Sequence, residues 1–251
     1  MNILKKMIKL KKKDNIYVLY LENKPVNALS VEFIHELSEL IDEISNDDSL
    51  RGLILGSSLK HFSAGADLKE RSLMTKEESI NVVYSIKLLI VKILNFPSPT
   101  LSLINGACLG GGLELACSCD FRLCSKDAVF AFPETSLGII PGAGGTQLLP
   151  RIIGLSNAKK MIFSGEKINS ETALAYGLVG DIIENNKLFD YGLKEMKRLT
   201  SNSSLATKIA KKSIDEGYDL DIKSALNIEF REYIKTLDSK ERLNALKKYR
   251  K

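Results

Sequence analysis

Two glutamates, Glu114 and Glu134, are the side chains of this sequence best suited to acid–base chemistry. Glu114 has Leu113 and Leu115 beside it, and Glu134 follows a short apolar stretch and Pro133. A carboxylate with apolar neighbours is costly to bury unless it is paired or functional. Two such groups close together shift each other's pKa, so that one can give a proton while the other takes one. Either glutamate alone is more often a surface residue, but the pair indicates a catalytic site.

Three glycines, 110 to 112, stand two residues before Glu114, between an expected buried strand and an expected helix. Glycine lets the backbone approach a ligand closely, and amides at a helix start point outward with the positive end of the helix dipole behind them. This pattern favours an anion hole, although a tight turn without a ligand explains it as well. A second turn of small residues, Phe62–Leu68, offers another amide, and two donors from separate loops suit a developing oxyanion. Dinucleotide-binding and P-loop glycine patterns are absent from the sequence.

These turns need strands and helices to position them, and the pattern of apolar residues predicts a layered α/β domain. Strands are expected at 16–21, 53–55, 100–104 and 121–124. Helices are expected after Ser30, after Thr75 with Glu78 as a capping box, from Leu113, and after the caps Ser156 and Ser170, the last two ending near Gly165 and Gly177.

The alternation of strands and helices stops near residue 200, after which everything is predicted to be helical. Three helices are expected there: one ending at Gly217, one across Asp221–Thr236, and one from Ser239 to the end. We therefore expect a core domain over 1–200 and a helical region over 201–251. So short a helical region has little core of its own, and it must pack on the main domain or on another subunit.

Length and composition are those of a globular protein that needs no disulfide or metal for stability. The chain has 251 residues, 44% of them hydrophobic and 27% charged, and no apolar run is long enough to cross a membrane. The lysine-rich segment 1–13 lacks the features of a secretory signal or a transit peptide, so a cytoplasmic location is expected. The net charge of +5 comes mainly from 5–13 and 247–251, which we interpret as solvated tails, with an anionic ligand or nucleic acid as the alternative.

Cysteine and histidine do not form a recognisable reactive site. The cysteines at 108, 117, 119 and 124 fall in expected core elements, which predicts buried, reduced thiols. The spacing of Cys117 and Cys119 does not match a zinc site, and His35 and His61 are far from them in sequence. We expect no metal, no serine or cysteine nucleophile, and a surface position for both histidines.

Four stretches resemble the successive signatures of the enoyl-CoA hydratase/isomerase, or crotonase, superfamily. They are 62–71, 105–116, 133–134 and 140–147, and the resemblance runs from about Ile16 to Tyr249. It implies a spiral of β-β-α turns followed by a helical region used in trimer assembly, with trimers commonly pairing into hexamers. It also implies an acyl-CoA substrate and no separate cofactor.

The resemblance further implies roles for individual residues. The N–H groups of Ala66 and Gly111 are expected to polarise the thioester carbonyl, Glu114 to activate a water, and Glu134 to supply a proton to the α-carbon. Contacts with coenzyme A are expected from Lys24, Val26, Ala28, Ala64, Asp67 and Leu68, and an aromatic contact with the adenine from Tyr233.

Both glutamates are present, which by the family's pattern favours hydration over double-bond isomerisation. Residues 65–71 and 110–115 most resemble the methylglutaconyl-CoA hydratase branch, so the expected substrate is a short-chain or branched 2-enoyl-CoA. Isomerisation or another acyl-CoA activity of the superfamily is the alternative.

Two positions depart from the family's pattern. Leu148 stands where many members have an arginine, which does not affect catalysis. The chain ends at Lys251, before a lysine that many members use near the coenzyme, which puts binding of the adenine end in doubt.

RNA binding is the alternative of another class. The same branch includes a protein that binds AU-rich RNA through a lysine-rich helix. The matching stretch here, Val31–Leu50, is acidic and contains no lysine, which argues against that property, while the lysine-rich amino terminus keeps the alternative open.

Overall fold

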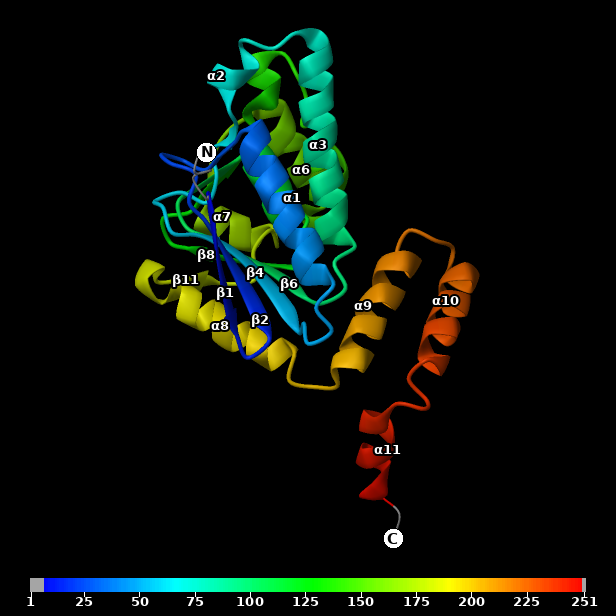
Figure 1. The fold of residues 1–251 in the computed structure, drawn as a ribbon. Helices are drawn as coiled ribbons and strands as arrows, with labels where there is room; N and C mark the ends of the chain where they lie inside the picture. Colours follow the sequence, from blue (N-terminus) through cyan, green and yellow to red (C-terminus); the bar gives the residue numbers. More distant parts are fainter. Residues whose placement is uncertain (1–6, 250–251) are drawn as a thin grey trace.

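A six-stranded sheet forms the centre of the fold in the computed structural model, which describes residues 7–249 (Figure 1). Its strand order is β1-β2-β4-β6-β8-β11, and all neighbours are parallel except β1 and β2. The strands are β1 (Ile8–Lys13), β2 (Ile16–Leu21), β4 (Gly52–Ser57), β6 (Thr100–Ile104), β8 (Phe121–Ser125) and β11 (Ile182–Ile183).

Short strands follow the long ones and pair among themselves. They are β3 (Ala28–Leu29), β5 (Gly65–Ala66), β7 (Ala107–Leu109), β9 (Val129–Ala131) and β10 (Ile168–Asn169). β3 pairs with β5, and β9 lies between β7 and β10. A long strand, a short strand and one or more helices therefore repeat along the chain, which is the expected spiral of β-β-α turns.

The helices of the core domain lie on both sides of the sheet (Figure 1). They are α1 (Val31–Ser45), α2 (Leu68–Arg71), α3 (Lys76–Leu94), α4 (Gly111–Cys117), α5 (Gly145–Ile153), α6 (Leu155–Ser164), α7 (Ser170–Ala175) and α8 (Leu188–Leu199), with 3₁₀ turns η1 (Pro133–Leu137) and η2 (Asn185–Lys187). Two predicted N-caps are confirmed: the Ser30 hydroxyl accepts from the N–H of Phe33, and Thr75 and Glu78 form a capping box.

The predicted caps Ser156 and Ser170 are wrong. Helix α6 starts at Leu155 because the chain turns at Gly154, whose φ of 77° is the left-handed conformation that glycine tolerates. Helix α7 is capped by Asn169, whose side chain accepts from the N–H of Thr172. An asparagine one residue earlier is as good a cap as serine, so the local signal was ambiguous.

The interpretation of the lysine-rich amino terminus as a solvated tail is also wrong for residues 8–13. This stretch is strand β1, paired with β2 from Ile8 opposite Leu21 to Lys13 opposite Ile16. Beyond Ile8 its side chains are exposed, as suits a lysine-rich strand at the edge of a sheet. Residues 1–6 and 250–251, which include parts of the two charged ends, lie outside the described residues.

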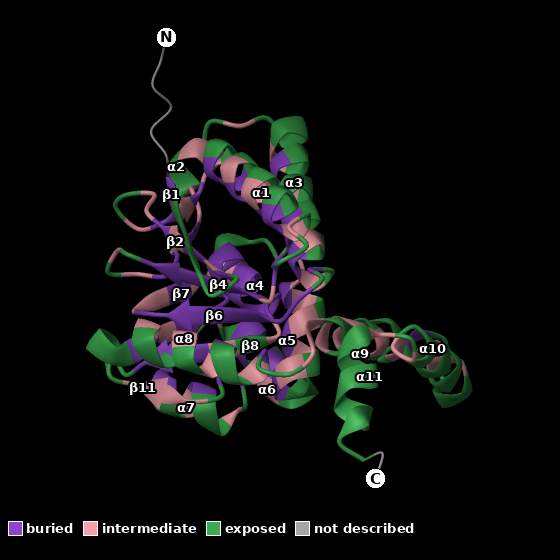
Figure 2. Ribbon diagram, turned by 60° about the horizontal axis from the view of Figure 1, so that its bottom comes forward, coloured by how far each residue is buried: buried purple, intermediate pink, exposed green. Residues whose placement is uncertain are grey.

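The strands at the centre of the fold are buried (Figure 2), and apolar side chains cover both faces of the sheet. One face packs against α1 and α3 in the larger buried cluster, and the other packs against α8 through Leu103, Leu188 and Met196. The four cysteines are buried and free, as predicted, and burial raises the pKa of Cys117 and Cys119 to about 12, so they stay protonated.

Three helices, α9 (Ser204–Gly217), α10 (Ile222–Ile234) and α11 (Lys240–Lys247), extend from one side of the core (Figures 1 and 2). They confirm the predicted helices within the described residues. The connection from α8 to α9 lies at 200–203, where the domain boundary is expected. The Lys211 ammonium donates to the Asp120 carboxylate at 2.5 Å, and this contact links α9 to the core. No helix within residues 7–249 is long and apolar enough to span a bilayer.

Candidate active site

Glu114 is buried inside the core, on the first turn of α4, with 3% of its surface exposed. Its Oε1 accepts hydrogen bonds from the N–H groups of Ala143 and Gly145, both at 2.8 Å. Burial raises the pKa of Glu114, and these amide hydrogen bonds oppose that shift because they favour the ionised form. The carboxylate is therefore held in one orientation with Oε2 left for another partner.

Glu134 lies in η1, directly after Pro133, and is partly buried. Its Oε2 is buried and has no hydrogen-bond partner among the described residues. Burial raises the pKa of Glu134 to about 7, with a smaller contribution from the nearby charge of Glu114. A carboxyl group with this pKa exchanges protons near neutral pH, as a general acid or base requires.

The glycine run brings the two carboxylates together. A Cβ added to Gly110 would lie 2.7 Å from Oε1 of Glu134, and one added to Gly111 would lie 3.9 Å from Oε2 of Glu114. Gly110 also has a positive φ of 51°, so any side chain there would be strained as well as obstructed. Because Gly110 and Gly111 have no side chains, they leave space next to both carboxyl groups.

Two backbone amides reach the same place. The virtual Cβ of Gly111 lies 3.9 Å from the amide nitrogen of Ala66, and that of Gly65 lies 3.3 Å from the amide nitrogen of Gly111. Gly111 is the first residue of α4, so its N–H has no acceptor within the helix. The amides of Ala66 and Gly111 and the carboxylates of Glu114 and Glu134 therefore all lie close to the glycine run.

Asn27 supports the loop that carries Ala66. Its buried side-chain amide donates to the hydroxyl of Ser57 at 2.7 Å and to the carbonyls of His61 and Phe62 at 3.1 and 3.0 Å. These bonds hold the loop between β4 and β5 against β3, so the Ala66 amide has a fixed position.

The residues expected to bind coenzyme A form two adjacent stretches. The N–H of Ala64 donates to the carbonyl of Val26 at 3.0 Å, and Ala28 pairs with Gly65 between β3 and β5. Lys24 and Leu68 are exposed nearby in sequence, and the Asp67 carboxylate caps α2 by accepting from the N–H groups of Lys69 and Glu70.

Tyr233 is not brought to this group within one chain. It lies on α10, which packs on α9 away from the core, and it is 55% exposed (Figure 1). Its expected contact with the adenine stays a prediction.

Sequence reasoning missed the support of Glu114 by Ala143 and Gly145, which are 29 and 31 residues away. The small side chains of residues 138–145 indicated that this backbone could approach another group closely. They did not indicate that the group is Glu114. The expected surface position of His61 is wrong, because this half-buried side chain accepts the N–H of Ala107 through Nδ1. Within residues 7–249, no cluster of three or more histidine, cysteine or acidic side chains is placed to hold a metal ion.

Comparisons with known proteins show the family of the chain. A profile described as enoyl-CoA hydratase/isomerase matches residues 11–251. The chain is 40% identical to a probable enoyl-CoA hydratase 2 of Arabidopsis thaliana, over 89% of this chain and 75% of that protein. It is 39% identical to the human mitochondrial methylglutaconyl-CoA hydratase, over 88% and 66%. The crystal structure of an enoyl-CoA hydratase from Bacillus anthracis superposes with a TM-score of 0.94 at 34% identity, covering 97% of this chain and 96% of that one.

Proposed function

The chain belongs to the enoyl-CoA hydratase/isomerase family and is an enzyme of the hydratase type, and from this premise we propose that it adds water across the 2,3 double bond of a short-chain or branched 2-enoyl-CoA. One observation supports the proposal: two backbone amides and two carboxylates lie close to Gly110 and Gly111.

The amides of Ala66 and Gly111 form the oxyanion hole in this proposal. They donate to the thioester oxygen, which gains negative charge as water adds to the double bond. Fixed dipoles aimed at that oxygen stabilise the transition state more than the ground state, and the loss of one such donor typically costs about 2.7–4 kcal/mol.

Glu114 is the base and Glu134 the acid. Glu114 accepts a proton from water, whose oxygen bonds to the β-carbon, and the double-bond electrons move toward the thioester carbonyl. Glu134 then delivers a proton to the α-carbon, which completes the 3-hydroxyacyl thioester. The amides at Oε1 of Glu114 favour its ionised form, and the pKa of Glu134, about 7, allows it to carry a proton.

Coenzyme A lies across the two adjacent stretches, with Lys24, Val26 and Ala28 on one side and Ala64, Asp67 and Leu68 on the other. The pairing of β3 with β5 supports this arrangement, because it puts both stretches next to the amide of Ala66. Coenzyme A is part of the substrate, and no other cofactor enters the reaction.

The protein assembles as a trimer, or as a hexamer of two trimers. Support comes from the large apolar side chains that α9 and α10 leave exposed, among them Ile214, Ile222 and Phe230, at 66–71% exposure. Since Tyr233 lies away from the site of its own chain, a contact between this residue and the adenine is made in the site of a second copy.

A panel of 2-enoyl-CoA thioesters tests the proposal. Loss of the conjugated thioester absorbance on addition of enzyme, with a 3-hydroxyacyl product, supports hydration. An isomerase instead converts a 3-enoyl-CoA to a 2-enoyl-CoA and raises that absorbance. If the enzyme did this and hydrated no member of the panel, double-bond isomerisation would replace hydration as the proposed activity.

A further inference from the structure

The two glutamates of the candidate site are supported in different ways. Glu114 accepts hydrogen bonds from the N–H groups of Ala143 and Gly145. No other residue of 7–249 donates a hydrogen bond to the carboxyl group of Glu134, and its Oε2 is buried without a partner. The position of this carboxyl group therefore depends on the backbone that carries it, which is the 3₁₀ turn η1.

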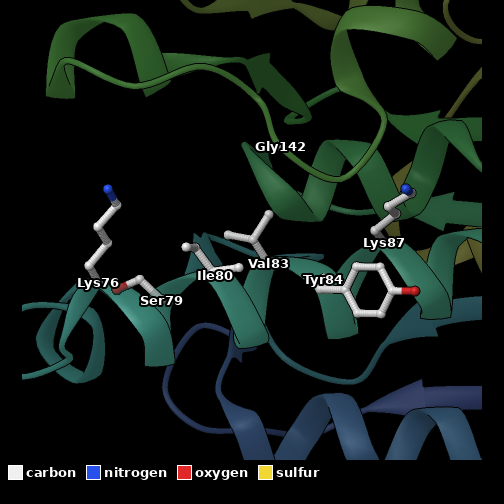
Figure 3. A pocket seen from close by; sticks show the side chains of 7 residues that line it. All are labelled: Lys76, Ser79, Ile80, Val83, Tyr84, Lys87 and Gly142. Carbon is white, nitrogen blue, oxygen red and sulfur yellow. The ribbon is translucent and has the colours of Figure 1, made fainter.

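The chain that follows Thr135 leaves the core. Residues 136–140 are exposed, and the next buried residue is Pro141. The backbone packs closely again at Gly142, where an added Cβ would lie 2.8 Å from Cγ1 of Val83, at the edge of the groove along α3 (Figure 3). This contact is next to Ala143, which supports Glu114, and it leaves η1 to be held by other contacts.

Thr135 supplies such a contact. Its hydroxyl donates to the carbonyl oxygen of Ile162 at 2.8 Å, and the carbonyl oxygen of Phe163 lies 3.5 Å away. Both carbonyls belong to the last turn of α6, where carbonyl oxygens lack an amide partner within the helix. The other hydrogen bonds of 133–140 among the described residues stay within that segment. The Thr135 hydroxyl is thus the polar link between η1 and the rest of the core domain.

Gly165 allows α6 and η1 to approach each other closely. It follows α6 with a left-handed φ of 65°. A Cβ added to Gly165 would lie 3.5 Å from Cα of Pro133 and 3.8 Å from the hydroxyl oxygen of Thr135. Glu134 stands between these two residues in the chain. The end of α6 therefore lies against the part of η1 that carries Glu134.

We propose that Thr135 is a positioning residue for hydration: its hydrogen bond to the last turn of α6 fixes η1, and with it the carboxyl group of Glu134. This inference rests on the proposed function, because it assumes that Glu134 delivers the proton to the α-carbon. Thr135 acts through Glu134 and takes no part in the proton transfer itself.

Thr135→Val tests the inference, because it keeps the shape of the side chain and removes the hydroxyl. Hydration of crotonyl-CoA, or of the best substrate of the panel, by the full-length enzyme is expected to lose about tenfold or more in kcat with little change in KM, since a small displacement of a reacting group slows the chemical step. A displaced Glu134 is also more exposed to water, which lowers its pKa from about 7 toward the ordinary value of a glutamate. The decrease of kcat/KM with rising pH should therefore begin at a lower pH than in the unaltered enzyme.

Further variants separate positioning from other effects. Thr135→Ser keeps the hydroxyl and is expected to restore most of kcat and the pH profile. Ser136→Ala is the matched control, because it removes the neighbouring hydroxyl, whose bond to the carbonyl of Pro133 stays within η1. It should leave kcat and the pH profile unchanged. In an enzyme that already carries Glu134→Gln, Thr135→Val should cause no further loss of kcat, because the two residues act as a unit.

A Thr135→Val enzyme with the kcat and pH profile of the unaltered protein overturns the inference. A lower kcat with an unshifted pH profile and a lower melting temperature also overturns it, and assigns the hydroxyl to stability alone. Thr135→Ala removes the same bond and replaces Thr135→Val if that variant does not fold. An unaltered enzyme that hydrates neither crotonyl-CoA nor any other member of the panel contradicts the proposed function instead.

Discussion

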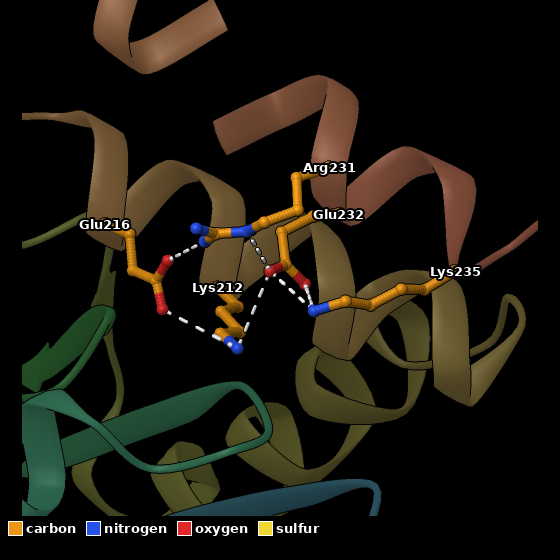
Figure 4. A network of polar contacts seen from close by, with 5 residues as sticks. All are labelled: Lys212, Glu216, Arg231, Glu232 and Lys235. Atoms are coloured by element: carbon orange, nitrogen blue, oxygen red, sulfur yellow. Dashed lines mark hydrogen bonds and ion pairs between the residues drawn. The ribbon is translucent and has the colours of Figure 1, made fainter. Parts of the chain in front are cut away.

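The core and the helical region both bury glutamates, but they surround them differently. No lysine or arginine of the described residues forms an ion pair with Glu114 or Glu134, and burial raises both pKa values. Glu232 on α10, 1% exposed, contacts Lys235 at 2.7 Å, Arg231 at 3.2 Å and Lys212 at 3.6 Å, and its pKa is lowered (Figure 4). Burial without a cation raises the pKa of a carboxyl group, to about 7 for Glu134, whereas the cations around Glu232 lower its pKa and keep it charged between two helices.

The two regions differ in the same way in their apolar residues. The core buries its large apolar side chains on both faces of the sheet. From Ser204 to Tyr249 the one buried residue is Glu232, and several large apolar side chains of α9 and α10 are exposed. The helical region is therefore held to its own chain by polar contacts, such as Lys211 with Asp120, and its apolar surface is available to another copy.

The largest expected effect separates the two kinds of buried glutamate. Glu114→Gln and Glu134→Gln each keep the shape of the side chain and remove its proton exchange, so kcat for hydration should fall about 100-fold or more. Glu232→Gln is the matched control and should leave kcat close to that of the unaltered enzyme. Hydration that survives either core substitution would show that the paired carboxylates are not the acid and base.

The pH dependence of hydration sharpens the same comparison. The proton that Glu134 delivers must be present before the reaction, and the pKa of Glu134 is about 7. The protonated fraction then decreases about tenfold per pH unit above this value, and kcat/KM should decrease with it. Initial rates from pH 6 to 9 measure this, and a flat profile to pH 9 would contradict the assignment of Glu134 as the acid.

The apolar face of the helical region should control assembly. Ile214→Asp combined with Phe230→Asp places two charges where a second copy is expected to pack, and desolvating them disfavours association. Light scattering should then report the 27.8 kDa mass of a single chain, with the circular dichroism of a folded protein. Asn227→Asp, which adds a charge at an exposed polar position of α10, should keep the assembly. A double variant with the mass of the unaltered protein would place the interface elsewhere.

The smallest expected effect is an opposite pH dependence of stability in the two regions. The folded-state pKa of Glu134 is raised, so its contribution to stability is present below about 4.5 and lost as the pH rises through 7. Glu134→Gln should thus gain stability relative to the unaltered protein between pH 5 and 8. The pKa of Glu232 is lowered, so its contribution is present above about 4.5 and lost in acid, and Glu232→Gln should cost most at neutral pH.

Thermal unfolding midpoints measured across this pH range check both signs. If the midpoints of Glu134→Gln and Glu232→Gln changed with pH in the same direction relative to the unaltered protein, the two carboxylates would not have opposite pKa shifts.

Local signals in the sequence predicted the parts of the fold that local contacts determine. Ser30 and Thr75 were identified as caps because the bonds that they make span only three residues. Strand β1 was not identified in this way, because the alternation of apolar residues with lysines covers only Ile8 to Lys11 and the strand then ends in a run of lysines. Its structure depends on pairing with β2.

The candidate site likewise combines features that the local sequence indicates with features that depend on long-range contacts. Glu114, Glu134 and the glycines were found from residue type and spacing. The bonds from Ala143 and Gly145 to Glu114 arise only when distant turns of the spiral stack on one another.

A crystal structure of the protein with a bound, unreactive acyl-CoA thioester tests the central claim most directly. The account predicts a thioester oxygen about 2.7–3.1 Å from the amide nitrogens of Ala66 and Gly111, with Glu114 and Glu134 on either side of the β-carbon and α-carbon. A thioester bound elsewhere, or one that reaches only one amide with both carboxylates turned away, would contradict it.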